Sequence, residues 1–191
     1  MNSYIFTKAI SVDREVLRST VYKVAERAIR DHSAKLENDS TYFGKGSPTT
    51  RMYKWYNFFE EPEAQDLFKE LQTFFKETFR PTQKYVIQSW VNIHKKGEFL
   101  GWHGHWPREA MSYHGYFCVD AEPSFTIYRI PGYTEEVAVP NKDGVLLVSP
   151  SQGDQHRVSE WNEDRDRVTI AFDIVPWIKI EIDNTHMIPF I

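Results

Sequence analysis

The most informative part of this chain reads Gly97-Glu-Phe-Leu-Gly-Trp-His103-Gly-His105-Trp-Pro107. In an extended strand, residues i and i+2 point to the same side, so His103 and His105 can direct two imidazoles at one point. A second stretch, Gly144-Val-Leu-Leu-Val-Ser-Pro-Ser-Gln-Gly-Asp-Gln-His156-Arg-Val158, carries a third histidine after an apolar run. A strand that brings His156 beside the first pair would complete one face of a metal site. The spacing therefore predicts a metal centre with these three histidines as candidate ligands and catalytic residues.

The segment after His156 offers a site for an anion. A charged turn leads into an apolar strand that begins at Arg167, so that Arg167 and Thr169 share one face. A guanidinium group binds a carboxylate through two parallel hydrogen bonds, and a nearby hydroxyl adds a donor. Burial of Arg167 in an apolar strand would be hard to explain without an anion, whereas Arg165 suits an ordinary charged turn. We therefore expect Arg167 and Thr169 to hold the carboxylate of a cofactor.

Composition narrows the class of protein. The 191 residues are 41% hydrophobic and 15% aromatic, which is typical of a single folded domain with a proper core. The formal net charge of −4 argues against nucleic acid or an anionic membrane as a partner. The N-terminus lacks the features of a signal peptide, and no apolar run approaches the about 18 residues of a membrane span. Cys118 is the single cysteine, which excludes an internal disulfide and fits a reducing, cytoplasmic setting.

The first third of the chain is predicted to be helical. Residues 12–29, with Ser11 as N-cap, repeat apolar side chains at helical spacing: Val16, Leu17, Val21, Val24, Ala25, Ala28 and Ile29. A second helix begins near Pro62, ends at Arg80-Pro81 and should pack on a sheet through one stripe: Ala64, Leu67, Phe68, Leu71, Phe74, Phe75 and Phe79. Between the helices, residues 32–50 are a polar loop and a candidate lid, and residues 51–59 are expected to form a strand or a wall of the substrate site.

From Tyr85 onward the pattern changes to strands. Runs of β-branched and aromatic residues between turn sequences predict strands at 86–93, 112–119, 124–129, 145–149 and 168–182. Strands that follow helices in this way are typical of an antiparallel sandwich or barrel with helices on one face. We therefore expect a mainly β, α+β fold in one domain over residues 1–191. Residues 1–82 would form a helical support, and residues 83–182 a jelly-roll core with the metal in its mouth.

The two histidine stretches and their surroundings resemble a known family. Ser89-Trp90-Val-Asn92, the two histidine segments, Ser112 to Phe117 and Arg167-Val-Thr-Ile-Ala-Phe-Asp173 are similar to 2-oxoglutarate- and Fe(II)-dependent oxygenases of bacteria and phages, relatives of prolyl 4-hydroxylases. The resemblance covers roughly residues 85–177. It implies a double-stranded β-helix, Fe(II), the small-molecule co-substrate 2-oxoglutarate, oxygen and a dioxygenase activity, with hydroxylation of an unidentified primary substrate. It also implies metal ligation by His103, His105 and His156 and carboxylate binding by Arg167.

The ligand set nevertheless stays open. Such oxygenases usually show His-x-Asp or His-x-Glu, whereas this chain has His105 in the carboxylate position. One reading is an all-histidine set, another has Glu109 or Asp154 as the acid ligand, and a third is loss of metal binding. A neutral set leaves one more positive charge at the metal and should tighten anionic ligands.

The remaining histidines and several aromatic residues have less specific interpretations. We expect His32, His114 and His186 to be ordinary surface or hydrogen-bonded core residues, whereas His94 lies on the strand that leads to the site. Four aromatic side chains are candidates either for lining the cavity or for packing within the barrel: Trp102, Trp106, Tyr116 and Tyr128.

Two other functions compete with the oxygenase. The first is a cupin, because Gly97-x5-His103-x-His105-x3-Glu109-x5-Gly115 lies within one residue of the first cupin motif. A cupin would be a metal-dependent dioxygenase or an isomerase that does not use 2-oxoglutarate. Arg167-x-Thr169 and the helical first third argue against it. The second is a non-catalytic jelly-roll binding module in which the histidines serve structure.

Overall fold

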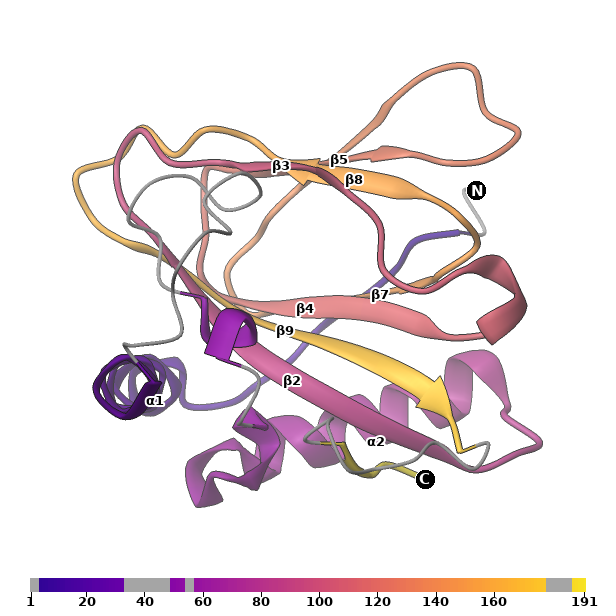
Figure 1. Ribbon diagram of the computed structural model, residues 1–191, viewed down its shortest axis with the longest axis horizontal. Coiled ribbons are helices and arrows are strands. Elements are labelled where there is room, and N and C mark those ends of the chain that lie inside the picture. The colour runs from indigo at the N-terminus through magenta and orange to yellow at the C-terminus, as the bar shows by residue number, and fades with distance from the viewer. Residues whose placement is uncertain (1–3, 33–48, 54–56, 178–186) are drawn as a thin grey trace.

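The computed structural model describes residues 4–32, 49–53, 57–177 and 187–191 and consists of two antiparallel sheets with helices on one outer side (Figure 1). The strand order is β1-β7-β4-β9-β2-β10 in the larger sheet and β3-β8-β5-β6 in the smaller one. The elements, in chain order, are β1 (Phe6–Ala9), α1 (Arg14–His32), η2 (Thr50–Tyr53), η3 (Phe58–Glu60), η4 (Pro62–Ala64), α2 (Gln65–Phe79), β2 (Tyr85–His94), β3 (Leu100–His103), η5 (Arg108–Ala110), β4 (Tyr113–Asp120), β5 (Phe125–Arg129), β6 (Val137–Pro140), β7 (Val145–Pro150), β8 (Gln155–Val158), β9 (Arg167–Pro176) and β10 (Ile188–Pro189). The mainly β, α+β arrangement that the sequence predicts is confirmed.

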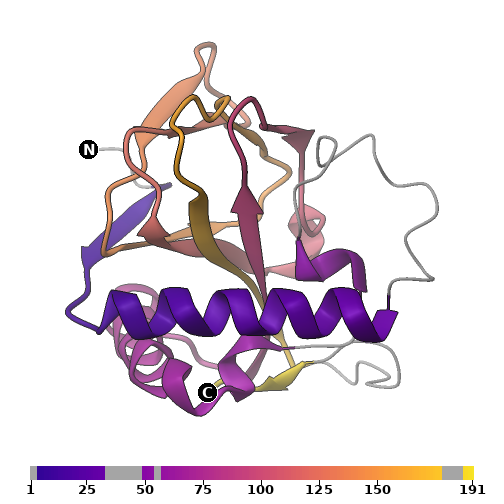
Figure 2. The ribbon, with the colours of Figure 1, turned by 90° about the vertical axis from the view of Figure 1, so that its left-hand side faces the viewer.

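The main hydrophobic core lies between the larger sheet and the helices. Both α1 and α2 cover the face of this sheet that turns away from the smaller sheet (Figures 1 and 2). Successive strand residues point to opposite faces, so every second residue of β2 and β9 reaches this core. The core takes side chains from both helices and both strands: Leu17, Val21, Val24, Leu67, Leu71, Phe75, Ile87, Val91, Ile93, Val168, Ile170, Phe172 and Ile174. All ten residues of β9 are buried, which means that its other face is covered as well.

Both predicted helices are present, with differences at their ends. The Oδ1 of Asp13 accepts a hydrogen bond from the Val16 N–H at 3.0 Å, so Asp13 is the N-cap and the prediction of Ser11 was wrong. The reason is that α1 begins at Arg14 and leaves Ser11 outside the first turn. Val16 and Ile29 lie at the edge of the apolar stripe and are 42% and 40% exposed. Neither helix of the described residues is long and apolar enough to cross a membrane.

The five predicted strands correspond to β2, β4, β5, β7 and β9, and five shorter strands escaped prediction. The added strands have two to four residues, too few to show an alternating pattern. Two of them, β1 and β10, join the larger sheet from outside residues 83–182. Residues 51–59 were expected to form a strand or a wall of the substrate site; the described ones form the short 3-10 helices η2 and η3 instead of a strand, and Arg51 lines the pocket. The candidate lid at residues 32–50 falls mostly on positions 33–48, outside the described residues.

Gly115 of β4 lies where two neighbours leave no room for a side chain. A Cβ at this position would be 2.1 Å from the Leu147 carbonyl oxygen and 2.6 Å from the Phe172 ring. We predict that Gly115→Ala lowers the free energy of unfolding by about 1–3 kcal/mol or more, because the backbone of a central strand must shift. Urea unfolding would measure the change. The control is Gly101→Ala in β3, where a Cβ meets nothing within 4 Å. Equal stability of the two variants would contradict this account.

Candidate metal centre and anion pocket

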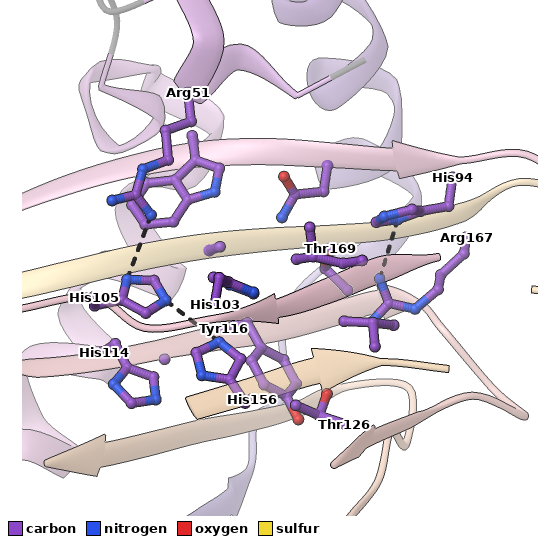
Figure 3. A pocket seen from close by; sticks show the side chains of 16 residues that line it. Arg51, His94, His103, His105, His114, Tyr116, Thr126, His156, Arg167 and Thr169 are labelled. Carbon is purple, nitrogen blue, oxygen red and sulfur yellow. Dashed lines mark hydrogen bonds between the residues drawn. The ribbon is translucent and has the colours of Figure 1, made fainter. Parts of the chain in front are cut away.

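Three imidazoles converge between the two sheets. His103 ends β3 and is paired in register with His156 of β8, and His105 follows two residues after His103. The Nε2 atoms of His105 and His156 are 3.3 Å apart, and one ligand nitrogen from each of the three rings lies within 4.8 Å of the others (Figure 3). His105 lies beyond the end of β3, so strand alternation alone does not bring the pair together. A close approach at Gly104 contributes, since a Cβ there would be 3.1 Å from the Asp154 carbonyl oxygen.

His103 and His156 are uncharged at neutral pH, so each ring has a nitrogen lone pair that can bind a metal. Burial lowers the pKa of the His103 and His156 imidazoles to about 3, so both are neutral at pH 7. The Nδ1 of His103 lies 2.9 Å from the Gly101 carbonyl oxygen, a contact that needs a proton on Nδ1 and leaves Nε2 free. Converging neutral imidazoles are what a divalent transition metal binds. The donor set present therefore fits a metal such as Fe(II).

A second group of side chains lies against the first. Asp154 Oδ2 is 3.8 Å from His156 Nδ1 and 3.5 Å from His114 Nε2, and these three atoms also lie within 4.8 Å of one another. Asp154 thus faces the nitrogen of His156 that does not face His105. Burial opposes ionisation of Asp154, yet the contacts with His156 and His114 lower the pKa of its carboxyl to about 2.

The sequence analysis expected His114 to be an ordinary surface or core histidine and considered Glu109 as an acid ligand of the metal. His114 is buried and contacts Ser151 Oγ at 3.0 Å, as a hydrogen-bonded core histidine would. It also lies at the site, because its ring centroid is 4.7 Å from that of His105, and this location was not foreseen. Glu109 is exposed on η5 and belongs to neither group of potential ligands, so its candidacy as the acid ligand finds no support.

Arg167 lies in the same pocket, away from His103, His105 and His156 and beside His94 (Figure 3). Its side chain is 2% exposed, its Nε–H donates to Ser124 Oγ at 2.8 Å, and its Nη1 is 3.3 Å from His94 Nδ1. Burial lowers the pKa of His94 to about 3, so that ring is a neutral neighbour. Among the described residues no carboxylate pairs with Arg167. Since an unpaired buried charge is costly, this guanidinium group points to a bound anion.

One pocket connects the candidate metal ligands with Arg167 and Thr169. Its walls come from both sheets and from η2: Arg51, Trp90, Asn92, His94, Leu100, His103, His105, His114, Gly115, Tyr116, Thr126, His156, Val158, Arg167, Thr169 and Ala171. Of the aromatic candidates, Tyr116 lines this pocket. Trp106 instead donates its indole N–H to Asp173 at 3.2 Å, Tyr128 packs beside His156, and Trp102 lies under the guanidinium of Arg129.

The sequence analysis missed two charged residues of the site. Arg51 of η2 lies over the Trp90 ring at 4.3 Å and reaches the histidines, although the segment had been expected only as a strand or wall. Asp173 is fully buried on β9, with Oδ1 2.5 Å from His105 Nδ1. A signal for Asp173 existed, because it shares the face of Arg167 and Thr169 and is an acid within an apolar strand.

Comparison with known proteins rests on structure. No protein-family model matches the sequence, and no curated protein matches it either. The fold is similar to a prolyl-4-hydroxylase of Pseudomonas putida, with a TM-score of 0.60, 13% identity and coverage of 90% of this chain and 92% of that one. It is also similar to the viral collagen prolyl hydroxylase of Paramecium bursaria Chlorella virus-1 in its 2-oxoglutarate complex, with a TM-score of 0.59, 12% identity and coverage of 91% and 96%.

AviO1 of Streptomyces viridochromogenes adds a third similar structure, with a TM-score of 0.61, 14% identity and coverage of 91% and 90%. The chain has the double-stranded β-helix fold of the 2-oxoglutarate oxygenases. Its two sheets correspond to the jelly roll that the sequence analysis expected. The fold also occurs in an epimerase and a carbocyclase of nogalamycin biosynthesis, so it does not by itself determine a substrate.

We predict that His156→Ala abolishes binding of Fe(II), because it removes the ring that faces both other imidazoles. Binding would be measured by anaerobic equilibrium dialysis with metal analysis. His94→Ala is the matched control, since His94 is another buried neutral histidine of the same pocket and lies beside Arg167. Iron retained at full stoichiometry in His156→Ala would rule out this ligand set.

Proposed function

We propose that this protein is an Fe(II)- and 2-oxoglutarate-dependent dioxygenase, and that it hydroxylates its primary substrate. One observation carries the proposal: a buried arginine, which has no carboxylate partner among the described residues, shares a pocket with three converging imidazoles, two of them held neutral. A metal and a separate anion site in one cavity match a dicarboxylate that binds the metal at one end and an arginine at the other. The fold of the similar oxygenases supports the same assignment.

In this proposal His103, His105 and His156 hold the iron. Three nitrogen ligands on one side leave positions for the 2-oxo acid and for oxygen. When bound, the iron and 2-oxoglutarate supply the oxidising chemistry: the co-substrate loses CO₂ to give succinate, and the two oxygen atoms are divided between succinate and the primary substrate. Because the three ligands are neutral, the centre is more positive than one with a carboxylate ligand and favours the anionic co-substrate.

The residues at the Arg167 side orient the co-substrate. Arg167 would offer its guanidinium group to the far carboxylate, with the Thr169 hydroxyl beside it. Ser124 accepts from Nε, and His94 lies beside Nη1; neither contact uses Nη2, which would face the ligand. Both Arg167 and Thr169 are 2% exposed, so a carboxylate there would bind without competing water.

The primary substrate remains to be found. Two similar proteins are a collagen prolyl hydroxylase and a prolyl hydroxylase bound to a peptide of hypoxia-inducible factor, which makes peptides reasonable first compounds to test. Oxygen and 2-oxoglutarate are the small-molecule partners that we propose. A reducing, cytoplasmic location also remains our expectation, since the single cysteine, Cys118, is buried and unpaired.

A cupin-type dioxygenase that does not use 2-oxoglutarate is the second candidate. The all-histidine donor set favours it, because in the described part of the chain no carboxylate joins the converging ligand atoms of His103, His105 and His156. Arg167 weighs against it, because this guanidinium group is buried, has no carboxylate partner among the described residues, and would not be needed by a cupin of that kind. Arg167 therefore separates the two functions experimentally.

The decisive experiment is an anaerobic titration of the Fe(II)-loaded protein with 2-oxoglutarate, followed through the visible iron-to-ligand charge-transfer band. We predict that the band appears with the wild type. In Arg167→Ala the apparent Kd should rise on the order of 100-fold, because charge-assisted hydrogen bonds contribute about 1.5–3 kcal/mol each. Arg167→Lys should fall between the two, since it keeps the charge but loses the planar fork. Iron stoichiometry should stay unchanged in both variants.

Arg165→Ala is the matched control. Arg165 lies two residues earlier in the chain, is exposed, and forms an ion pair with Asp120 away from the pocket. Its Kd for 2-oxoglutarate should equal that of the wild type. Iron bound without a band, or a band indifferent to Arg167, would favour the cupin. Absence of metal binding would leave a non-catalytic binding module.

A further inference from the structure

His105 occupies the position in which a carboxylate ligand is usual, and a carboxylate lies directly behind it. Asp173 Oδ1 is 2.5 Å from His105 Nδ1, whereas the other ring nitrogen, Nε2, faces His156 at 3.3 Å. The Asp173 side chain is fully buried. Among the described residues, Oδ1 has no hydrogen-bond partner of good geometry, and the His105 Nδ1 is the polar atom in close contact with it. The carboxylate therefore depends on His105 to satisfy that oxygen.

The other oxygen of Asp173 fixes the direction of the carboxylate. Oδ2 accepts from Gln88 Nε2 at 2.8 Å and from the Trp106 indole at 3.2 Å. Gln88 and Asp173 are register partners in the β2–β9 pair, so the strand pairing itself sets their distance. Arg51 Nη2 also lies 3.6 Å from Oδ2, so a cation accompanies these two donors. A buried carboxylate with a fixed direction thus faces His105.

This contact selects one tautomer of His105. Arg51 Nη1 also approaches His105 Nδ1, at 3.4 Å, but a guanidinium group only donates and would need a bare nitrogen. The carboxylate contact is shorter and fully buried, whereas the Arg51 side chain is 36% exposed. From this short contact we assign the proton to Nδ1, on the side of the ring that faces Asp173. The lone pair is then on Nε2, toward the centre of the cluster.

His156 has a similar but looser arrangement, and His103 does not. Asp154 Oδ2 lies 3.8 Å from His156 Nδ1, while His103 Nδ1 meets only the neutral Gly101 carbonyl at 2.9 Å. Anionic support therefore decreases from His105 to His156 to His103. A carboxylate behind a ligating imidazole orients the ring and raises its basicity.

We propose that Asp173 is a positioning residue of the metal centre, which supplies through His105 the negative charge that the all-histidine ligand set lacks. The inference rests on the proposed metal site. It explains how histidine can stand in the carboxylate position: the anion is retained one hydrogen bond away from the metal. Asp154 gives weaker support of the same kind through His156.

The test is a titration of the metal-free protein with Co(II), which needs neither turnover nor oxygen and has a visible spectrum that reports ligand strength. Asp173→Asn should weaken Co(II) binding about 10–100-fold and shift the visible bands, because the amide keeps the shape but loses the charge. Asp154→Asn should have a smaller effect. Asp143→Asn is the control, since Asp143 accepts backbone N–H groups of Ala121 and Glu122 away from the pocket. It should bind Co(II) as the wild type does.

A double-mutant cycle separates positioning from direct ligation. In a His105→Ala background, Asp173→Asn should cause no further loss, because Asp173 acts through His105. A further loss of affinity would show that Asp173 ligates the metal itself and would overturn the proposal. Unchanged affinity and spectrum in Asp173→Asn alone would overturn it as well. If the wild type binds no metal, the proposed function fails instead.

A measurement on the wild type covers the case in which Asp173→Asn does not fold. The Nδ1 proton of a ligating His105 should give a paramagnetically shifted NMR resonance in the Co(II) protein, present in H₂O and absent in D₂O. The resonance is assigned by its loss in His105→Ala. Its slow exchange with solvent, slower than that of the corresponding His103 proton, would support the carboxylate contact. Absence of such a resonance would contradict it.

Discussion

The antiparallel pairing of β2 with β9 is the constraint on which the rest of the structure depends. The two strands are in register over their full length, from Tyr85 opposite Pro176 to His94 opposite Arg167. One face of the pair, with Val91 and Ile170, belongs to the core beneath the helices. The opposite face carries the residues of the site. A slip of one residue would exchange the two faces and place charges in the hydrophobic core, so burial of the apolar face fixes the register.

That register distributes charge along the pocket. His94 and Arg167 pair at one end of the ladder, and Gln88 and Asp173 pair farther along it, beside His105. The Arg167 guanidinium and the Asp173 carboxylate thus lie apart on the same face of the sheet. Arg167 contacts the neutral Ser124 and His94, and Asp173 Oδ2 accepts from the neutral Gln88 and Trp106, so one side of each charged group has no such neutral partner. The open side of Asp173 faces His105, a candidate metal ligand, and the open side of Arg167 faces the pocket, so the two ends of the pocket differ chemically.

The smaller sheet contributes the candidate metal ligands, on the side of the pocket opposite the larger sheet. β3 and β8 place His103 opposite His156, and Tyr128 of β5 is the next partner in the same row. The imidazoles therefore come from one sheet and its following loop, whereas the carboxylate behind His105 and the anion-binding arginine come from the other. Neither sheet alone carries both the histidine cluster and the arginine that line the pocket. This division makes the site sensitive to the packing of the two sheets, and that packing rests on the helix-covered core.

Local sequence patterns were sufficient for part of this picture. The apolar stripe of α2 and the alternation in β2 and β9 are properties of neighbouring residues, as are the spacing of His103 and His105 and the spacing of Arg167 and Thr169. The short strands β3 and β8 have too few residues to show an alternating pattern, although they carry two of the candidate metal ligands, His103 and His156. The contact of Asp173 with His105, the position of Asp154 behind His156 and the reach of Arg51 over Trp90 were decided only by the tertiary structure. The physical reason is that each joins groups on different elements, where the register between strands and the packing of two sheets set the distance, and no spacing along the chain records it.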